Sequence, residues 1–330
     1  MTVGPTTSAL ETGAVPPTRR GRSVPETSAL IFVLIAMCVF FAFRSEFFLT
    51  ADNFINILVS ASVIGIVAAP ATLLLVSGQF DLSVGSGAAL IGVVMAWGVS
   101  QYGVPQAILL CILTGIAIGI VNGISVTIIG INALITTLAM LAILHGLALV
   151  LAGGQTLPLP DFGGIGNARP LFNIPVPVFL FIGVTILTSL AMRFTVFGRS
   201  MYAIGANPVA ARLAGIKTGR AVFIGFILSG LAVVLGGLIL VSQLGAASPQ
   251  AATGLELAVV TAVILGGASL AGGRGTILGT VLGVFILGVL SNGMTLISVD
   301  SFWQQVAQGC LLLLAVGFDQ FRLRLAGKSR

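Results

Sequence analysis

Residues 104–152 read VPQAILLCILTGIAIGIVNGISVTIIGINALITTLAMLAILHGLALVLA and contain no aspartate, glutamate, lysine or arginine. They belong to a longer interval, between Asp81 and Asp161, in which 79 consecutive residues carry none of these four side chains. A membrane-spanning helix needs roughly 20 apolar residues, at a rise of about 1.5 Å per residue. The interval therefore has room for three spans and their turns.

Composition separates this chain from water-soluble proteins. Of its 330 residues, 57% are hydrophobic and only 7% are charged, whereas about a quarter of the residues of a soluble domain are charged. A chain with so few charges cannot cover its surface in water, and lipid removes that requirement. The three cysteines lie far apart in apolar runs, without metal-ligand spacing, so we interpret them as packing residues.

Ten apolar segments follow one another and predict an all-α polytopic membrane protein of about ten transmembrane helices. The segments are roughly 28–48, 54–77, 83–100, 104–128, 131–152, 174–192, 221–243, 254–271, 276–297 and 302–319. An even number of spans places both termini on one side of the membrane. A re-entrant segment near Gly78–Gly85 stays open as an alternative to a plain turn there.

The basic residues follow the positive-inside rule. With the N-terminus in the cytoplasm, thirteen of the fifteen Lys and Arg residues fall inside, and only Arg44 and Arg169 fall outside. The thirteen are Arg19, Arg20, Arg22, Arg193, Arg199, Arg212, Lys217, Arg220, Arg274, Arg322, Arg324, Lys328 and Arg330. Membrane topology thus explains the net charge of +6 without any binding of nucleic acid, and we expect both termini in the cytoplasm.

The predicted organisation has three parts. Residues 1–27 are rich in Pro, Thr, Ser and Arg and predict a disordered basic tail. Residues 28–320 form the transmembrane domain, with a basic loop at 193–220, and residues 321–330 form a second basic tail. Similar tripeptides at Leu75 and Leu240, and Asn-Gly pairs at 122 and 292, are offset by 165 and 170 residues. A five-plus-five inverted repeat is therefore one arrangement that the sequence admits.

The basic loop contains a candidate docking helix. It reads FTVFGRSMYAIGANPVAARLAGIKTGR over residues 194–220. Asn207 suits a helix N-cap, Pro208 suits the first helical position, and Gly215 suits the left-handed end. The result is a helix of about seven residues with small side chains at 210, 211 and 214. It is suited to a groove on a cytosolic partner, and a connecting loop anchored to acidic lipid is the alternative.

At this loop the sequence resembles a known family. Gly205–Ile216 is similar to the cytoplasmic coupling motif of the ribose/xylose/arabinose-type permease subunits of ATP-binding-cassette sugar importers. The stretches Gly78–Ser86, Leu265–Thr276 and Ser301–Val306 resemble the same family in the same order, so the resemblance covers about residues 30–320. It implies that the ATPase-coupling residues are Asn207, Pro208, Ala210, Ala211, Leu213, Ala214 and Gly215.

The resemblance also implies partners and a cargo. It implies a homodimer of permeases in a bacterial inner membrane, a cytosolic ATPase, and a periplasmic or extracellular sugar-binding protein that delivers a pentose or hexose. No complete Gly-x-x-x-x-Gly-Lys-Ser/Thr loop occurs in the sequence, because Gly272–Thr276 lacks the lysine and Arg322 replaces a glycine near Lys328. We therefore expect a transport subunit that is not an enzyme and binds no cofactor or metal, with ATP and Mg used by the partner.

Polar residues in apolar segments are candidates for the gate or the transport pathway. A neutral polyol needs hydrogen-bonding partners that do not hold it too strongly. The candidates are Gln79, Asp81, Ser83, Asn122, Asn132, Thr136, Thr137, Asn292, Gln304 and Gln305. Hydrogen bonding between helices is the alternative for each of them. For Asp81 the alternative is an N-cap, with Asp81 and Ser83 accepting from the first amides of the third segment.

Competing functions are an ion-coupled secondary transporter, an intramembrane enzyme, and the same importer with another cargo. The first needs several ionisable groups within the bilayer, and only Asp81, Glu256 and His145 qualify. We expect His145 to be a packing residue. An enzyme needs a nucleophile with a base or a metal cluster, and the sequence has no such motif. A nucleoside, a signalling furanosyl compound or a branched-chain amino acid remains an alternative cargo.

Overall fold

The computed structural model describes residues 26–159 and 162–327, and almost all of their regular structure is helical. The first half holds α1 (Glu26–Arg44), α2 (Ala51–Val76), α3 (Val84–Tyr102), α4 (Val104–Ile124), the π-helical turn η1 (Ser125–Ile129) and α5 (Ala133–Ala152). The strand β1 (Leu157–Pro158) and the short α6 (Gly164–Asn167) follow. The second half holds α7 (Val176–Phe194), α8 (Val196–Ala206), α9 (Pro208–Leu213), α10 (Thr218–Leu244), β2 (Ala246–Ala247), α11 (Leu255–Leu265), α12 (Ile277–Leu296) and α13 (Ser301–Gly327).

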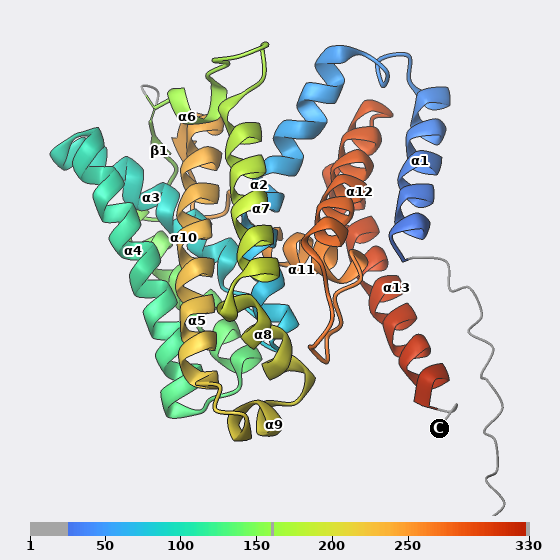
Figure 1. Cartoon of the computed structure of the whole chain (residues 1–330). Coiled ribbons are helices and arrows are strands. Elements are labelled where there is room, and N and C mark those ends of the chain that lie inside the picture. The colour runs from blue at the N-terminus through green and yellow to red at the C-terminus, as the bar shows by residue number, and fades with distance from the viewer. Residues whose placement is uncertain (1–25, 160–161, 328–330) are drawn as a thin grey trace, which may run out of the picture.

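The long helices confirm the predicted all-α polytopic membrane fold. Among the described residues, nine helical stretches are long and apolar enough to cross a membrane, and α11 is a shorter apolar helix. The nine stretches are α1, α2, α3, α4 with η1, α5, α7, α10, α12 and the first part of α13. The helices α8 and α9 lie at one end of the bundle, and α6 and β1 lie at the other (Figure 1).

The predicted eighth span, 254–271, is wrong as a continuous helix. The helix α11 has 11 residues and is about 16 Å long, roughly half of the hydrocarbon thickness. It ends at Leu265 with Gly266 as its C-cap, because Gly267 adopts a positive φ of 89°. The eighth crossing therefore combines the turns of residues 248–254 with a half-length helix, and the glycine-rich turn 266–276 leads on to α12.

The two ends of the chain can be compared in part with the predicted tails. The helix α1 begins at Glu26, and residues 1–25 of the predicted N-terminal tail lie outside the described residues. The helix α13 continues through Gly327, so it extends into the segment predicted as the C-terminal tail. Residues 328–330 lie outside the described residues.

Helix packing in the first half is matched in the second half. The helix α10 packs on α3 and α4, while α2 packs on α11 and α12. Likewise α3 packs on α4 and α5, while α11 packs on α12 and α13. Exchanging α2–α5 with α10–α13 reproduces these contacts, which supports an internal repeat of four of the five predicted pairs of helices. The helices α1 and α7 depart from the pattern, since α1 packs on α12 and α7 packs on α2.

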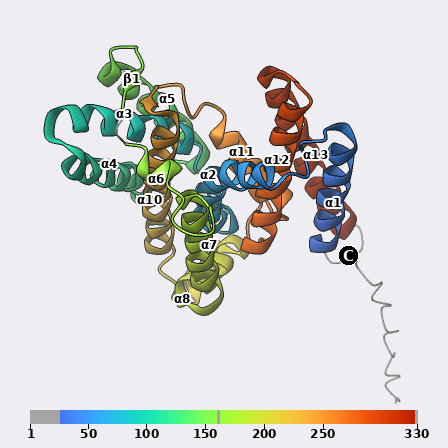
Figure 2. The ribbon, with the colours of Figure 1, turned by 90° about the horizontal axis from the view of Figure 1, so that it is seen from above.

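The bundle has two flanks and a centre. Seen from above, α3, α4 and α5 gather on one side, α1, α12 and α13 gather on the other, and α2, α7 and α10 lie between them (Figure 2). The largest buried cluster draws on both flanks and the centre, with Ile91 of α3, Ile239 of α10 and Leu287 of α12 among its fully buried members. The core is therefore continuous across the two halves.

Most of the basic residues that the structure describes lie at one end of the bundle. Arg193 ends α7, Arg212 lies in α9, and Arg274 lies in the turn between α11 and α12. That turn packs against α8, so these basic residues share the α9 end of the bundle. Arg169 follows α6 at the opposite end.

Glycines set the closest helix crossing between α4 and α10. A Cβ added at Gly119 would lie 2.7 Å from the carbonyl oxygen of Phe226 and 2.8 Å from the Cα of Ile227. Real Cβ atoms do not approach backbone so closely, so only glycine permits this separation. Small residues at helix crossings have this role in membrane proteins, where helices associate largely by close packing.

We predict that Gly119→Val lowers the free energy of unfolding by about 1–3 kcal/mol, because the added side chain overpacks the α4–α10 crossing. The measurement is thermal unfolding of the purified protein in detergent. Gly183→Val in α7 is the matched control, because a Cβ there meets no atom within 4 Å. Equal thermal midpoints for Gly119→Val and Gly183→Val would contradict the close approach of α4 and α10 at Gly119.

Candidate functional site

The segment between α2 and α3 holds a buried carboxyl group. Asp81 is 6% exposed. Its Oδ1 accepts from the amide of Ser83 at 3.1 Å and from the hydroxyl of Ser83 at 2.6 Å. Its Oδ2 accepts from the hydroxyl of Ser229 in α10 at 2.6 Å. Each carboxyl oxygen therefore has a donor, which is what makes a buried acid tolerable.

Asn122 joins α4 to this group of residues. Its Nδ2 donates to the hydroxyl oxygen of Ser83 at 3.0 Å, and the residue is fully buried. Its Oδ1 has no hydrogen-bond partner among the described residues. Asp81, Ser83, Asn122 and Ser229 form what we call the Asp81 network, which links the start of α3 to α4 and α10.

The predicted cap at α3 is wrong in its detail. Ser83 is the N-cap residue of α3, but its side chain accepts no hydrogen bond from the first amides of that helix. The hydroxyl is instead directed to Asp81, and Asp81 accepts from the Ser83 amide in a local turn. Ser83 has φ −78° and ψ −6°, which is helical rather than the extended conformation typical of a capping residue. A gating role for Asp81 stays a prediction.

Two other predicted pathway residues line a cavity of about 380 Å³ beside the Asp81 segment. Gln79, from the segment after α2, and Asn132, from the segment before α5, are both among its lining residues. The Asn132 side chain also accepts from the amide of Leu134 at 2.9 Å, so it caps α5. In the next turn Thr137 donates to the carbonyl of Ala133, while the hydroxyl of Thr136 has no partner among the described residues.

The remaining predicted pathway residues lie on the other flank of the bundle. Asn292 donates to Asn53 at 2.8 Å, which links α12 to α2. Gln304 contacts Ser291 and the hydroxyl of Thr295, at 2.9 and 3.1 Å, and so links α13 to α12. Gln305 is exposed. The structure therefore does not bring the ten predicted residues together, because α5 and α13 lie on opposite flanks (Figures 1 and 2).

The predicted docking helix is present as α9. The Asn207 side chain accepts from the amides of Val209 and Ala210, both at 3.0 Å. Pro208 is the first helical residue, and Gly215 has a φ of 82°. These three features confirm the helix start and stop that the sequence predicts. The helix ends one residue earlier than expected, with Ala214 as its C-cap.

The exposed surface of α9 includes Ala210 and Ala214, as predicted, together with Arg212 and two larger apolar side chains. Val209 is 59% exposed and Leu213 is 84% exposed. They are four residues apart and so share one side of the helix. Ala211 is only 4% exposed and packs in a cluster with Met201 and Ile204 of α8. Ala211, which we expected in a small outward face, therefore faces the bundle, and Leu213 dominates the outward face.

The helix α8 rests on the turn between α11 and α12. A Cβ added at Gly273 would lie 3.1 Å from the Cα of Ala206, the last residue of α8. The amide of Gly273 donates to the carbonyl of Val76, at the end of α2, at 2.7 Å. The Tyr202 hydroxyl donates to the carbonyl of Gly275 at 2.7 Å, and burial raises the pKa of Tyr202 above its usual value. The α9 end is thus joined to α2 and to the turn that follows α11.

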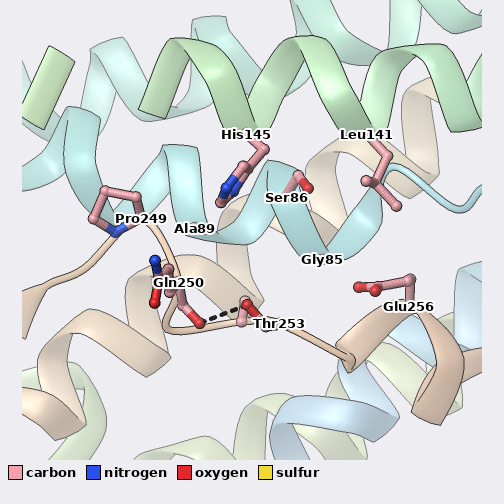
Figure 3. Close-up of a pocket in the computed structure, with 10 residues that line it drawn as sticks. Gly85, Ser86, Ala89, Leu141, His145, Pro249, Gln250, Thr253 and Glu256 are labelled. Carbon is pink, nitrogen blue, oxygen red and sulfur yellow. Dashed lines mark hydrogen bonds between the residues drawn. The ribbon is translucent and has the colours of Figure 1, made fainter. Parts of the chain in front are cut away.

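A second cavity, of about 370 Å³, lies between α3, α5 and the segment that leads into α11 (Figure 3). We call it the Glu256 cavity. It is lined by Gly85, Ser86, Ala89, Leu141, His145, Pro249, Gln250, Ala252, Thr253 and Glu256. None of these residues was among the predicted pathway residues, and His145 was expected to be a packing residue. The signal in the sequence was that Glu256 and His145 are ionisable groups in otherwise apolar segments.

Comparison with known proteins shows the family to which this chain belongs. Residues 53–316 match the model of a family described as branched-chain amino acid transport system / permease component. The chain belongs to this permease family. The match includes the Asp81 network, α9 and the Glu256 cavity, so each of these features lies in the body of the permease.

Curated relatives cover nearly the whole permease. The ribose import permease protein RbsC of Escherichia coli (strain K12) is 39% identical over 302 residues, which is 89% of this chain and 93% of RbsC. The L-arabinose transport system permease protein AraH of the same strain is 38% identical over 88% of this chain and 90% of AraH. The L-arabinose ABC transporter permease protein AraH of Azospirillum brasilense is 36% identical over 89% and 88%. No solved structure matches the permease.

Ser229 belongs to the site although sequence reasoning did not single it out. It lies in the apolar α10, 148 residues from Asp81, and no local motif marks it. Only the packing of α10 against the start of α3 shows its role. It supplies the donor to the Asp81 Oδ2.

We predict that Ser229→Ala lowers the free energy of unfolding of the permease by about 1–3 kcal/mol, because the Asp81 Oδ2 stays buried and loses its donor. The readout is the thermal unfolding midpoint in detergent. Ser200→Ala is the control, since the Ser200 hydroxyl donates to the Val196 carbonyl of its own helix. A Ser229→Ala midpoint equal to that of the control would show that the network contributes nothing to stability.

Proposed function

We propose that this chain is the membrane subunit of an ATP-driven importer that moves a monosaccharide, a pentose or hexose, into the cytoplasm. The observation that carries this proposal is identity of 36–39% to ribose and L-arabinose permeases over nearly the whole of both chains. The charge asymmetry supports a bacterial inner-membrane orientation with the α9 end and both termini in the cytoplasm.

The energy comes from another polypeptide in this proposal. The sequence has no complete phosphate-binding Gly-x-x-x-x-Gly-Lys-Ser/Thr loop. A cytosolic ATPase, which uses ATP and Mg, docks on α9 through Val209 and Leu213. Two exposed aliphatic side chains at one aqueous end of the bundle favour a protein partner over lipid headgroups. The chain itself contributes the pathway and binds no cofactor.

The contacts of α8 supply the route by which movement at α9 reaches the membrane. The helix α9 follows α8 directly, and α8 packs on the turn 266–276 and on the end of α2. That turn connects α11 to α12. A displacement of α9 by the ATPase therefore reaches α11, the half-length helix, and α12 through the turn that joins them. This is alternating access through a discontinuous span.

Two further partners belong to the proposal. A second copy of the permease completes the transport unit, and a periplasmic or extracellular binding protein delivers the sugar to the β1 end. The exposed faces of α5 and α13 are apolar, with Leu138, Ile143, Leu313 and Leu314 among the exposed side chains, and they suit lipid or a second copy. We expect the binding protein to determine which sugar is carried.

One observation favours a second cargo. The description of the matched family names branched-chain amino acids, so an importer of the same mechanism for a zwitterionic cargo is the alternative. An ion-coupled secondary transporter is the other alternative, since Asp81, Glu256 and His145 are ionisable groups among the spans. The first alternative differs from the proposal in its cargo, and the second differs in its energy source.

The proposal predicts ATP-dependent uptake of D-ribose or L-arabinose by proteoliposomes that contain the permease, its ATPase and its binding protein. Radiolabelled sugar accumulates only when ATP is enclosed on the ATPase side. An equal excess of unlabelled L-leucine does not reduce the uptake. Accumulation driven by a proton or sodium gradient with the permease alone, or uptake of leucine in place of sugar, would overturn the proposal.

We predict that Leu213→Glu abolishes ATP-dependent uptake and leaves the thermal midpoint of the permease unchanged, because Leu213 is 84% exposed and contributes to docking rather than to the core. Co-purification with the ATPase and uptake are measured together. Leu213→Met is the conservative control and retains both. Normal uptake by Leu213→Glu would show that Leu213 of α9 has no part in coupling to the ATPase.

A further inference from the structure

We propose that the Glu256 cavity is a monosaccharide-binding site inside a single subunit, with Glu256 and His145 holding the sugar from opposite walls. This inference rests on the proposed import function and deepens it by placing the cargo at named side chains. The sugar would meet α3, α5 and the start of α11, the half-length helix.

The first support is the convergence of polar side chains. His145 points from α5 toward α3, and Glu256 points from the first turn of α11 toward Gly85 (Figure 3). Both side chains are half-buried, and neither forms an ion pair with another described residue. Polar groups among membrane spans are tolerated where they face protein or a water-filled space. Here they face a cavity.

The second support is the way in which the carboxyl group of Glu256 is held. A Cβ at Gly85 would collide with the Glu256 carboxyl, so the glycine leaves the space that the acid occupies. Gly85 lies in the first turn of α3, and Glu256 lies in the first turn of α11. Two helix N-termini, each with a partial positive charge, therefore flank this carboxyl group. They favour a fixed hydrogen-bond acceptor that faces the cavity.

The chemistry of the walls favours a sugar. Each hydroxyl of a sugar both donates and accepts hydrogen bonds, and the lining offers a carboxyl, an imidazole, the amide of Gln250 and two hydroxyls. A volume of about 370 Å³ is near the lower limit for ligand pockets, which suits one small ring. Sites of this kind combine a few placed polar groups with apolar walls, and here Leu141 and Pro249 supply the apolar surface.

The same walls disfavour the alternative cargoes. The lining contains no lysine or arginine, so Glu256 could pair with the ammonium group of an amino acid but no cationic side chain would pair with its carboxylate. The lining also contains no Phe, Tyr or Trp on which a nucleobase could stack. A neutral ring of hydroxyl groups avoids both problems.

The position of Glu256 also links the site to the energy source. The helix α11 carries Glu256 in its first turn and ends in the turn that packs on α8. A shift of α11 changes the separation between Glu256, on α11, and His145, on α5. The site then binds the sugar in one arrangement and releases it in the other, as a transport pathway requires.

The uptake test compares Glu256→Gln with Glu46→Gln in proteoliposomes that contain the ATPase and the binding protein. Glu46 is an exposed acid between α1 and α2, so the control makes the same chemical change away from the cavity. We expect Glu256→Gln to lower the uptake of tritiated D-ribose or L-arabinose on the order of tenfold, while ATP hydrolysis stimulated by the binding protein persists. Glu46→Gln keeps the wild-type rate of uptake.

The outcomes separate this inference from the proposed function. Failure of the wild type to take up any sugar from a panel of pentoses and hexoses would sink the import function itself. Normal wild-type uptake together with normal Glu256→Gln uptake would overturn only the site.

A second measurement does not depend on replacing Glu256. Ser86→Cys is placed in the cavity and Ser100→Cys at the far, exposed end of the same helix, and each is labelled with a water-soluble maleimide. Labelling of the parent chain gives the contribution of the native cysteines. We expect D-ribose to slow the labelling of Ser86→Cys severalfold and that of Ser100→Cys not at all. No protection of Ser86→Cys by either sugar, or equal protection by L-leucine, would overturn the proposal.

Discussion

Inside a bilayer every backbone amide and carbonyl needs a partner within the protein, because hydrocarbon supplies none. The permease nevertheless interrupts its helices at residues 77–83, 248–254 and 266–276. Local turns satisfy part of this irregular backbone, as where the Thr253 amide donates to Gln250. Contacts between distant segments satisfy the rest, as where the Gly273 amide donates to Val76. The backbone of the breaks is thus hydrogen-bonded to protein at these positions, and the two cavities lie beside the first two breaks.

The repeat explains why two of the breaks meet. The exchange of α2–α5 with α10–α13 pairs α3 with α11, and each of these helices begins after an irregular segment. The first turns of α3 and α11 approach each other where Gly85 meets Glu256. The third break has no counterpart in this pairing, and it carries the contact with α8. The near symmetry of the two halves thus brings together the first turns of α3 and α11 at the Glu256 cavity. The third break, which has no symmetric counterpart, connects this cavity to α9 through α8.

Composition and short-range signals predicted much of the fold, because hydropathy and capping are local properties. The spans followed from uncharged runs, and α9 followed from Asn207, Pro208 and Gly215. The length of α11 did not follow, since residues 266–271 stay uncharged while glycine backbone ends the helix. The site was harder to predict because its partners are distant in sequence. Ser229 contacts Asp81 across 148 residues, and Asn292 and Asn122 belong to different flanks of the bundle.

The half-length α11 also constrains how the permease is made. The insertion machinery releases segments into lipid according to their hydrophobicity and length, and 11 residues reach only about half of the hydrocarbon. During synthesis α11 must therefore wait at the translocon until α12 emerges, and then enter as one arm of a hairpin against α2 and α3, which are already in place. The permease thus acquires its movable helix late, together with α12 and before α13, against helices that are already in place.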